Sequence, residues 1–173
     1  MSDVSPRPPQ IWVDADACPR PMREMLFKAA RRTGVQVTLV ANHPLPVPAL
    51  PNVTFRQVEK GFDVADNALL EWVNRGDLVI TQDTPLASDL LAKGAEAVSP
   101  RGVPWSPDTI RSKLAMRDFM ETLRASGVQT GGPSTLGPAE KQAFAAVLDR
   151  WLARVYQPAL RRSQSGQARS DRS

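Results

Sequence analysis

The stretch that most constrains the fold is Ile11–Asp16, in which three apolar residues are followed by two aspartates two positions apart. The apolar residues predict a short buried strand, and Pro19 and Pro21 suit the first turn of a helix that follows it. Two carboxylates this close repel one another unless a cation or a proton lies between them. Because α/β proteins bind ligands at the carboxyl ends of their strands, Asp14 and Asp16 predict a functional site.

Strand-like and helical patterns alternate along the rest of the chain. Apolar, β-branched runs predict further strands at 35–40, 53–58, 78–81 and 95–98. Amphipathic segments predict helices at 19–33, 64–75 and 86–93, and a C-terminal extension with helices at 106–124 and 138–156. This alternation predicts an α/β three-layer sandwich with a largely parallel central sheet.

The length of 173 residues predicts a single domain, which we expect to span 10–156 and to include the helical extension, 106–156. Segments 1–9 and 157–173 have the composition of disordered tails. The end of the chain, 161–173, carries four arginines and one aspartate, and therefore most of the net charge of +4. The global charge is for this reason a weak indication of nucleic-acid binding.

Several classes of protein are disfavoured by the sequence. No segment has the roughly 20 apolar residues that a membrane span requires, and the single cysteine cannot form an internal disulfide. We therefore expect a cytoplasmic protein without membrane contact. One cysteine and one histidine, Cys18 and His43, exclude a zinc site of Cys/His type, so a metal would be held by oxygen. Cys18 is a candidate nucleophile at a helix start, although most such cysteines are small buried residues.

Acidic residues also follow the third and fourth predicted strands. Asp63 and Asp66 follow the third strand and Asp83 follows the fourth. If the strands are parallel neighbours, these three acids join Asp14 and Asp16 at one edge of the sheet, where they can hold Mg²⁺ or Mn²⁺. Asn67 and Thr81 are candidates to orient the carboxylates or a metal-bound water. The alternative for Asp63, Asp66 and Asp83 is a helix-capping role alone.

Five motifs resemble the YaiI/YqxD family of bacterial proteins: Trp12–Pro19, Gly61–Asn67, Leu78–Asp83, Met116–Met120 and Thr130–Pro133. That family is placed among PIN-like domains, whose nuclease members bind Mg²⁺ or Mn²⁺ with clustered acids. The resemblance implies a PIN-like fold, with Asp14, Asp63, Asp66, and Thr81 with Asp83 at the positions of the family's polar site residues. PIN nucleases often carry one more acid, in the region that here spans 84–89, and only Asp89 is available there.

Together these observations predict a metal-dependent endoribonuclease. Asp14, Asp63 and Asp83 are the predicted metal ligands, and Asp16 and Asp66 are further ligands or bases that orient water. The candidate contacts to substrate phosphate are Arg101, Arg111 and Arg117. The alternative is that these arginines only form the solvent-exposed face of a helix. Trp105, in a predicted loop, is a candidate to stack on a base.

Two alternatives stay open. An apolar strand that ends in Asp14 and Asp16 is also the pattern of haloacid-dehalogenase-type phosphatases, in which the first acid is a nucleophile and the second an acid/base. That fold also needs a phosphate-binding lysine, and no convincing candidate is present in the sequence. The second alternative is a non-catalytic domain that binds metal or RNA.

Overall fold

The computed structural model describes the backbone of residues 7–127 and 136–170, and the side chains of 7–127 and 136–165. The Thr130–Pro133 motif and most of the segment 1–9 lie outside these ranges. Within the described residues, no helix is both long enough and apolar enough to cross a membrane.

Five strands form one sheet in the order β3-β2-β1-β4-β5, and every neighbouring pair is parallel. The strands are β1 (Ile11–Asp14), β2 (Val37–Ala41), β3 (Val53–Gln57), β4 (Leu78–Ile80) and β5 (Glu96–Val98). The prediction of a parallel α/β sheet is therefore confirmed. Because β1 lies at the centre, between β2 and β4, the end of β1 is surrounded by the carboxyl ends of two other strands.

Helices cover both faces of the sheet, which gives the three layers predicted. They are α1 (Arg20–Thr33), α2 (Val64–Trp72), α3 (Thr84–Ala92), α4 (Pro107–Ala125), α5 (Pro138–Trp151) and α6 (Gln157–Ser170), with a 3-10 turn η1 (Ala15–Ala17) and a π-helical turn η2 (Leu152–Tyr156). Ile11 and Val13 pack with α1 and α5 on one face, whereas Trp12 packs with α2 and α3 on the other. Since side chains alternate along a strand, Asp14 follows Trp12 to the face of α2 and α3.

Local sequence explains where α1 begins and ends and where α4 begins. Helix α1 begins directly after Pro19 and ends at Gly34, whose φ of +82° is a conformation that glycine adopts without strain. Ser106 caps α4, because its Oγ accepts a hydrogen bond from the backbone N–H of Thr109 at 3.2 Å.

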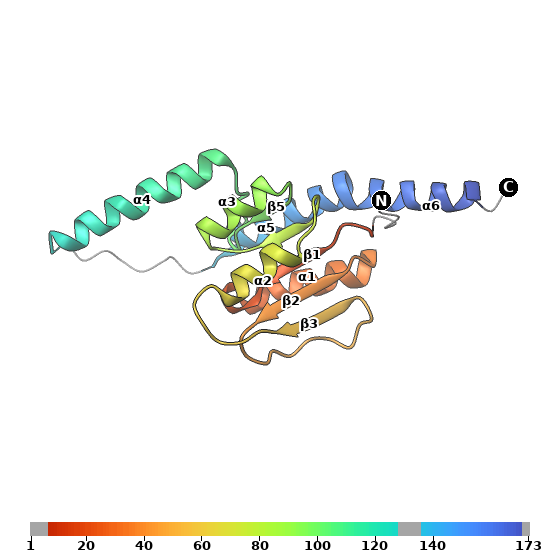
Figure 1. Cartoon of the computed structure of the whole chain (residues 1–173), viewed down its shortest axis with the longest axis horizontal. Coiled ribbons are helices and arrows are strands. Elements are labelled where there is room, and N and C mark those ends of the chain that lie inside the picture. Colours follow the sequence, from red (N-terminus) through yellow and green to blue (C-terminus); the bar gives the residue numbers. More distant parts are fainter. Residues whose placement is uncertain (1–6, 128–135, 171–173) are drawn as a thin grey trace.

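The C-terminal helices divide into one that packs on the domain and two that extend from it. Helix α5 places Phe144, Leu148 and Trp151 in the core against α1 and the sheet. Figure 1 shows α4 projecting away from the sheet on one side and α6 on the other. The structure places residues 157–170 in α6, whereas their polar composition predicts a disordered tail; the π-helical turn continues α5 directly into this segment.

Candidate functional site

Asp14 ends the central strand and is half-buried. Its Oδ2 accepts a hydrogen bond from the Thr81 hydroxyl at 3.3 Å, which lowers its pKa. Burial raises the pKa of Asp14 most, and the negative charge of Asp66 raises it next. With smaller contributions from the charges of Asp16 and Asp83, the pKa rises from 3.8 to about 6. The carboxyl group of Asp14 therefore lies in a partly dry and negatively charged environment.

Asp66 and Asp83 form the second part of the same acidic cluster. Asp66 lies in the first turn of α2 and its side chain is hydrogen-bonded to that of Asp83. Burial, then the charges of Asp83 and Asp63, and this hydrogen bond raise the pKa of Asp66 to about 6. Two carboxyl groups in hydrogen-bond contact need a proton or a cation between them.

Asp83 performs the predicted cap and also belongs to the cluster. It occupies the N-cap position of α3, where its Oδ1 accepts a hydrogen bond from the Leu86 N–H at 2.7 Å. Its interaction with Asp66 and its effect on the pKa of Asp14 place the same carboxyl group beside both other acids. Asp83 is therefore both a helix cap and a member of the cluster, and its role as a metal ligand stays a prediction.

Thr81 connects these acids to the rest of the fold. Its hydroxyl is fully buried, donates to Asp14, and accepts a hydrogen bond from the backbone N–H of Asp83 at 3.0 Å. Its carbonyl oxygen accepts a hydrogen bond from Trp105 Nε1 at 2.9 Å. Trp105 is only 7% exposed and packs against Ala87 and Ala97, so the prediction that it stacks on a base is wrong.

The route by which Asp66 reaches the cluster differs from the one that the sequence suggested. Strand β3 lies at the edge of the sheet and is separated from β1 by β2. Helix α2 crosses back from β3 over β2 and β1, which brings its first turn to Asp14. Asp63 lies one turn earlier, is exposed, and makes no side-chain cap, while Asn67 is exposed and donates its backbone N–H to the Asp63 carbonyl.

Asp16 has partners of its own, and its charge also raises the pKa of Asp14. Its Oδ1 lies 2.8 Å from His43 Nδ1, and its Oδ2 accepts a hydrogen bond from the Asn42 N–H at 3.1 Å. These partners follow β2, whose carboxyl end lies next to that of β1. The sequence did not link His43 to Asp16, because only the pairing of the two strands brings them together.

Cys18 is a buried thiol. It is 3% exposed, and burial raises its pKa to about 12, against a weaker lowering by Arg23. A thiol with that pKa stays protonated at neutral pH and is a poor nucleophile. The structure therefore supports the interpretation of Cys18 as a small buried residue.

The three candidate arginines lie in two different places. Arg101 follows β5 and its Nη1 lies 3.8 Å from Glu140 Oε1. Arg111 and Arg117 lie on the projecting helix α4, where they pair with Asp108 and Glu121 of the same helix. Their role in binding phosphate stays a prediction.

Sequence reasoning missed a buried acid, Asp77, at the amino ends of the strands. Asp77 is 2% exposed and accepts hydrogen bonds from the Gln10 N–H, the Asn74 N–H and Trp12 Nε1, at 2.9–3.0 Å. Burial raises the pKa of Asp77, and the three hydrogen bonds oppose this. Its contacts tie the starts of β1 and β4 together, which makes it a structural acid.

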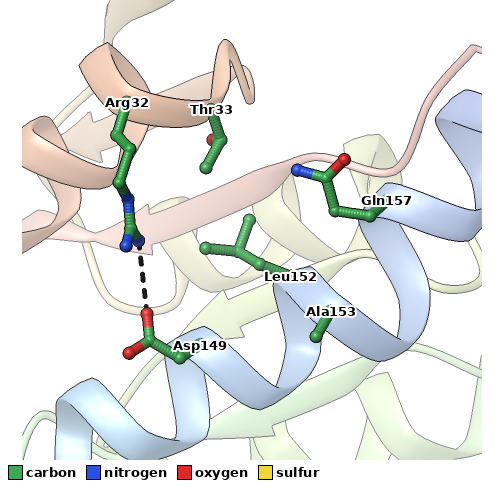
Figure 2. A pocket seen from close by; sticks show the side chains of 6 residues that line it. All are labelled: Arg32, Thr33, Asp149, Leu152, Ala153 and Gln157. Carbon is green, nitrogen blue, oxygen red and sulfur yellow. Dashed lines mark hydrogen bonds and ion pairs between the residues drawn. The ribbon is translucent and has the colours of Figure 1, made fainter.

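Figure 2 shows a surface pocket of about 430 Å³ between α1 and the α5–α6 region, crossed by an ion pair between Arg32 and Asp149. Arg32 and Thr33 lie at the end of α1, whereas the acids surround its beginning. The pocket is therefore separate from the acidic cluster, and none of the residues predicted from the sequence lines it.

Across the described parts of the chain, no group of three or more histidine, cysteine, aspartate or glutamate side chains is arranged so that it could hold a metal ion as it stands. What the structure does assemble is a hydrogen-bonded Asp66–Asp83 pair with Asp14 and Thr81 beside it. Such a cluster can share a proton, orient water, or bind a cation that also has ligands from elsewhere.

The all-parallel sheet and the acids at its carboxyl edge define a three-layer α/β protein with an acidic candidate site. The chain belongs to the uncharacterised YaiI/YqxD family, whose model matches residues 12–154. The resemblance of the sequence motifs to this family is thereby confirmed.

Close relatives carry the name UPF0178 protein. The protein of Xanthomonas oryzae pv. oryzae (strain PXO99A) is 56% identical over 156 residues, which cover 90% of this chain and 97% of the relative. That of Xanthomonas campestris pv. campestris (strain 8004) is 59% identical, covering 87% and 96%, and that of Yersinia enterocolitica is 57% identical, covering 83% and 94%. No solved structure matches the chain.

Proposed function

We propose that this protein is a metal-dependent nuclease that uses Mg²⁺ or Mn²⁺ and acts on RNA. The observation that carries the proposal is the convergence of Asp14, Asp66 and Asp83 at the carboxyl edge of the sheet. Their mutual repulsion and partial burial raise the pKa values of Asp14 and Asp66 to about 6, which is the electrostatic condition that a bound cation relieves.

The donor set fits a hard divalent cation held jointly with substrate. Mg²⁺ is usually bound by one or two carboxylates, with waters and substrate phosphates as its other ligands. One or two of the clustered acids would therefore suffice, which is a smaller set than the group of three ligands that the described residues do not form. Asp14, Asp66 and Asp83 would hold the ion, and the predicted ligand Asp63 adds negative charge beside Asp66.

When bound, such an ion lowers the pKa of water and neutralises charge on a phosphodiester. The chain's own residues prepare the site for this chemistry. The Thr81 hydroxyl donates a hydrogen bond to the Asp14 carboxyl group and accepts one from the Asp83 backbone N–H, and so it positions both residues. The cap on α3 fixes the other side of Asp83 through Leu86. A carboxylate that is not engaged by the ion can accept a proton from the attacking water.

The resemblance to PIN-like domains supports the same class of reaction, because nuclease members of that group use clustered acids. The test is cleavage of end-labelled single-stranded RNA and DNA by the wild-type protein in Mg²⁺, in Mn²⁺ and in EDTA. We expect metal-dependent cleavage of RNA that Asp14→Asn reduces by about a hundredfold or more, as is common for groups that stabilise transition-state charge.

Glu71→Gln is the matched control, since Glu71 is an exposed acid near the end of α2, away from the first turn that carries Asp66. It should cleave at the wild-type rate. Equal cleavage by wild type and Asp14→Asn would assign the activity to a contaminant, and no cleavage by wild type in either metal would refute the nuclease.

The phosphatase alternative is tested with the same preparation. It requires Asp14 as nucleophile and Asp16 as acid/base, but Asp16 is engaged by His43 and the Asn42 N–H. A trapped phospho-aspartate on Asp14 would support the phosphatase and refute the nuclease mechanism. RNA binding that is indifferent to Asp14→Asn, without turnover, would instead support a non-catalytic domain.

A further inference from the structure

Phe62 is the most exposed large apolar side chain in the described part of the protein, with 94% of its surface accessible. It contributes nothing to the three apolar clusters of the core. Burial of a phenyl ring is among the larger favourable contributions that a side chain makes to folding. A ring left in water is therefore available for contact with another molecule.

The backbone on both sides of Phe62 has an unusual conformation. Gly61 has a φ of +152°, and a Cβ atom at that position would lie 3.0 Å from Val64 Cγ2. Asp63 has a φ of +64° and is the only non-glycine residue with positive φ among the described residues. Glycine adopts such a conformation without strain, and aspartate is among the few other residues that tolerate the left-handed region, so both neighbours of Phe62 suit this loop.

This loop is attached to the helix that carries the acidic cluster. The Gly61 carbonyl accepts a hydrogen bond from the Val64 N–H at 3.5 Å, and the Asp63 carbonyl accepts one from the Asn67 N–H at 2.9 Å. Both donors belong to the first turn of α2, which also contains Asp66. Phe62 consequently lies on the loop that leads into α2, one turn of chain before Asp66.

The charges around the ring also indicate the kind of ligand. Asp63, directly after Phe62, is close enough to Asp66 to raise its pKa. Glu59 and Lys60, which precede the ring, are both exposed, so the loop carries one cation among acids. A cation and an aromatic ring on one loop can contact the phosphate and the base of one nucleotide.

We infer that Phe62 stacks on an unpaired nucleobase of the substrate, next to the phosphodiester that the acids act on. The inference rests on the proposed nuclease function and adds a residue that selects the substrate. The faces of a base inside a duplex are covered by its neighbours, whereas a base in a single strand can be splayed out onto an aromatic ring. Phe62 thus favours single-stranded segments over duplexes.

The test compares two fluorescently labelled strands of equal length, an oligouridylate and a sugar-phosphate chain without bases. Binding is measured by anisotropy in EDTA, where the proposed reaction is off. We expect Phe62→Ala to weaken binding of the oligouridylate about five- to a hundredfold and to leave the abasic strand unchanged. Phe62→Trp should bind the oligouridylate at least as well as the wild type.

Phe119→Ala is the matched control, because Phe119 is 58% exposed but lies on α4. It should bind both strands as the wild type does. Equal affinities of wild type and Phe62→Ala for the oligouridylate would overturn the inference. An equal loss of affinity for both strands in Phe62→Ala would also overturn it, and so would a wild type that binds neither strand.

Cleavage in Mn²⁺ separates this inference from the proposed function. Cleavage that depends on Asp14 but not on Phe62 would keep the nuclease and overturn the stacking role. Base-dependent binding through Phe62 without any cleavage would refute the nuclease and show a binding surface instead.

Discussion

Asp14→Asn is expected to stabilise the protein at neutral pH. The carboxyl group of Asp14 has a pKa of about 6 in the folded protein, against 3.8 as its ordinary value, mainly because it is partly buried and lies beside Asp66. Folding therefore opposes its ionisation. Asparagine has nearly the same shape, cannot ionise, and offers an oxygen that can accept the hydrogen bond of the Thr81 hydroxyl.

The size and the pH dependence of the effect follow from the two pKa values. A shift from 3.8 to about 6 corresponds to about 3 kcal/mol, since each unit is worth 1.36 kcal/mol. The folded state binds the proton more tightly than the unfolded state, so the wild-type protein loses stability as the pH rises from about 4 to about 6. The advantage of Asp14→Asn should be small below pH 4, grow through that window and stay constant above it.

Thermal unfolding of both proteins between pH 3.5 and pH 8 measures this difference. For a chain of this length, about 3 kcal/mol corresponds to roughly 6 to 12 °C in Tm. Mn²⁺ at a hundredfold excess over its Kd should stabilise only the wild type, by about 2.7 kcal/mol, and should therefore nearly cancel the difference between the two proteins at pH 7. Asp108→Asn should show neither effect, since its carboxylate is exposed on α4.

Two results would refute this reasoning. The first is an Asp14→Asn protein that is less stable than the wild type at pH 7, which would make the carboxylate a structural group. The second is a stability difference that does not change between pH 4 and pH 6, which would separate it from the ionisation of Asp14.

Three further predictions concern the other buried or capping groups. Asp77→Ala should lower the free energy of unfolding by roughly 3 kcal/mol or more in urea titrations, because it leaves buried donors such as Trp12 Nε1 without an acceptor; a loss below 1 kcal/mol would contradict the structural role. Asp83→Asn should be about 1 kcal/mol more stable than Asp83→Ala in the same titration, because only asparagine keeps an oxygen to cap Leu86, and equal stabilities would argue against the cap. Cys18 should react with a chromogenic disulfide at pH 8 only when the chain is unfolded, and rapid stoichiometric labelling of the native protein would contradict its burial.

The elements themselves could be predicted because their signals are local. The apolar run Ile11–Val13, the glycine after α1 and the cap at Ser106 each depend on residues a few positions apart. The same local signals placed the acids at the ends of β1 and β4. Trp105 shows the limit of this reasoning, because its position in a loop does not reveal that side chains of α3, β5 and α4 bury it.

The sequence by itself determined which residues stand at the strand ends and helix starts, since strand and helix periods are properties of short segments. The tertiary structure alone decided which of these residues meet. The order β3-β2-β1-β4-β5 put Asp14 beside Thr81 and Asp83, and the return of α2 across the sheet brought in Asp66 from an edge strand. The pairing of β1 with β2 gave Asp16 the histidine as its partner. Asp14 and Thr81, for example, lie 67 positions apart in the sequence, and only the packing of whole layers fixes a distance over such a separation.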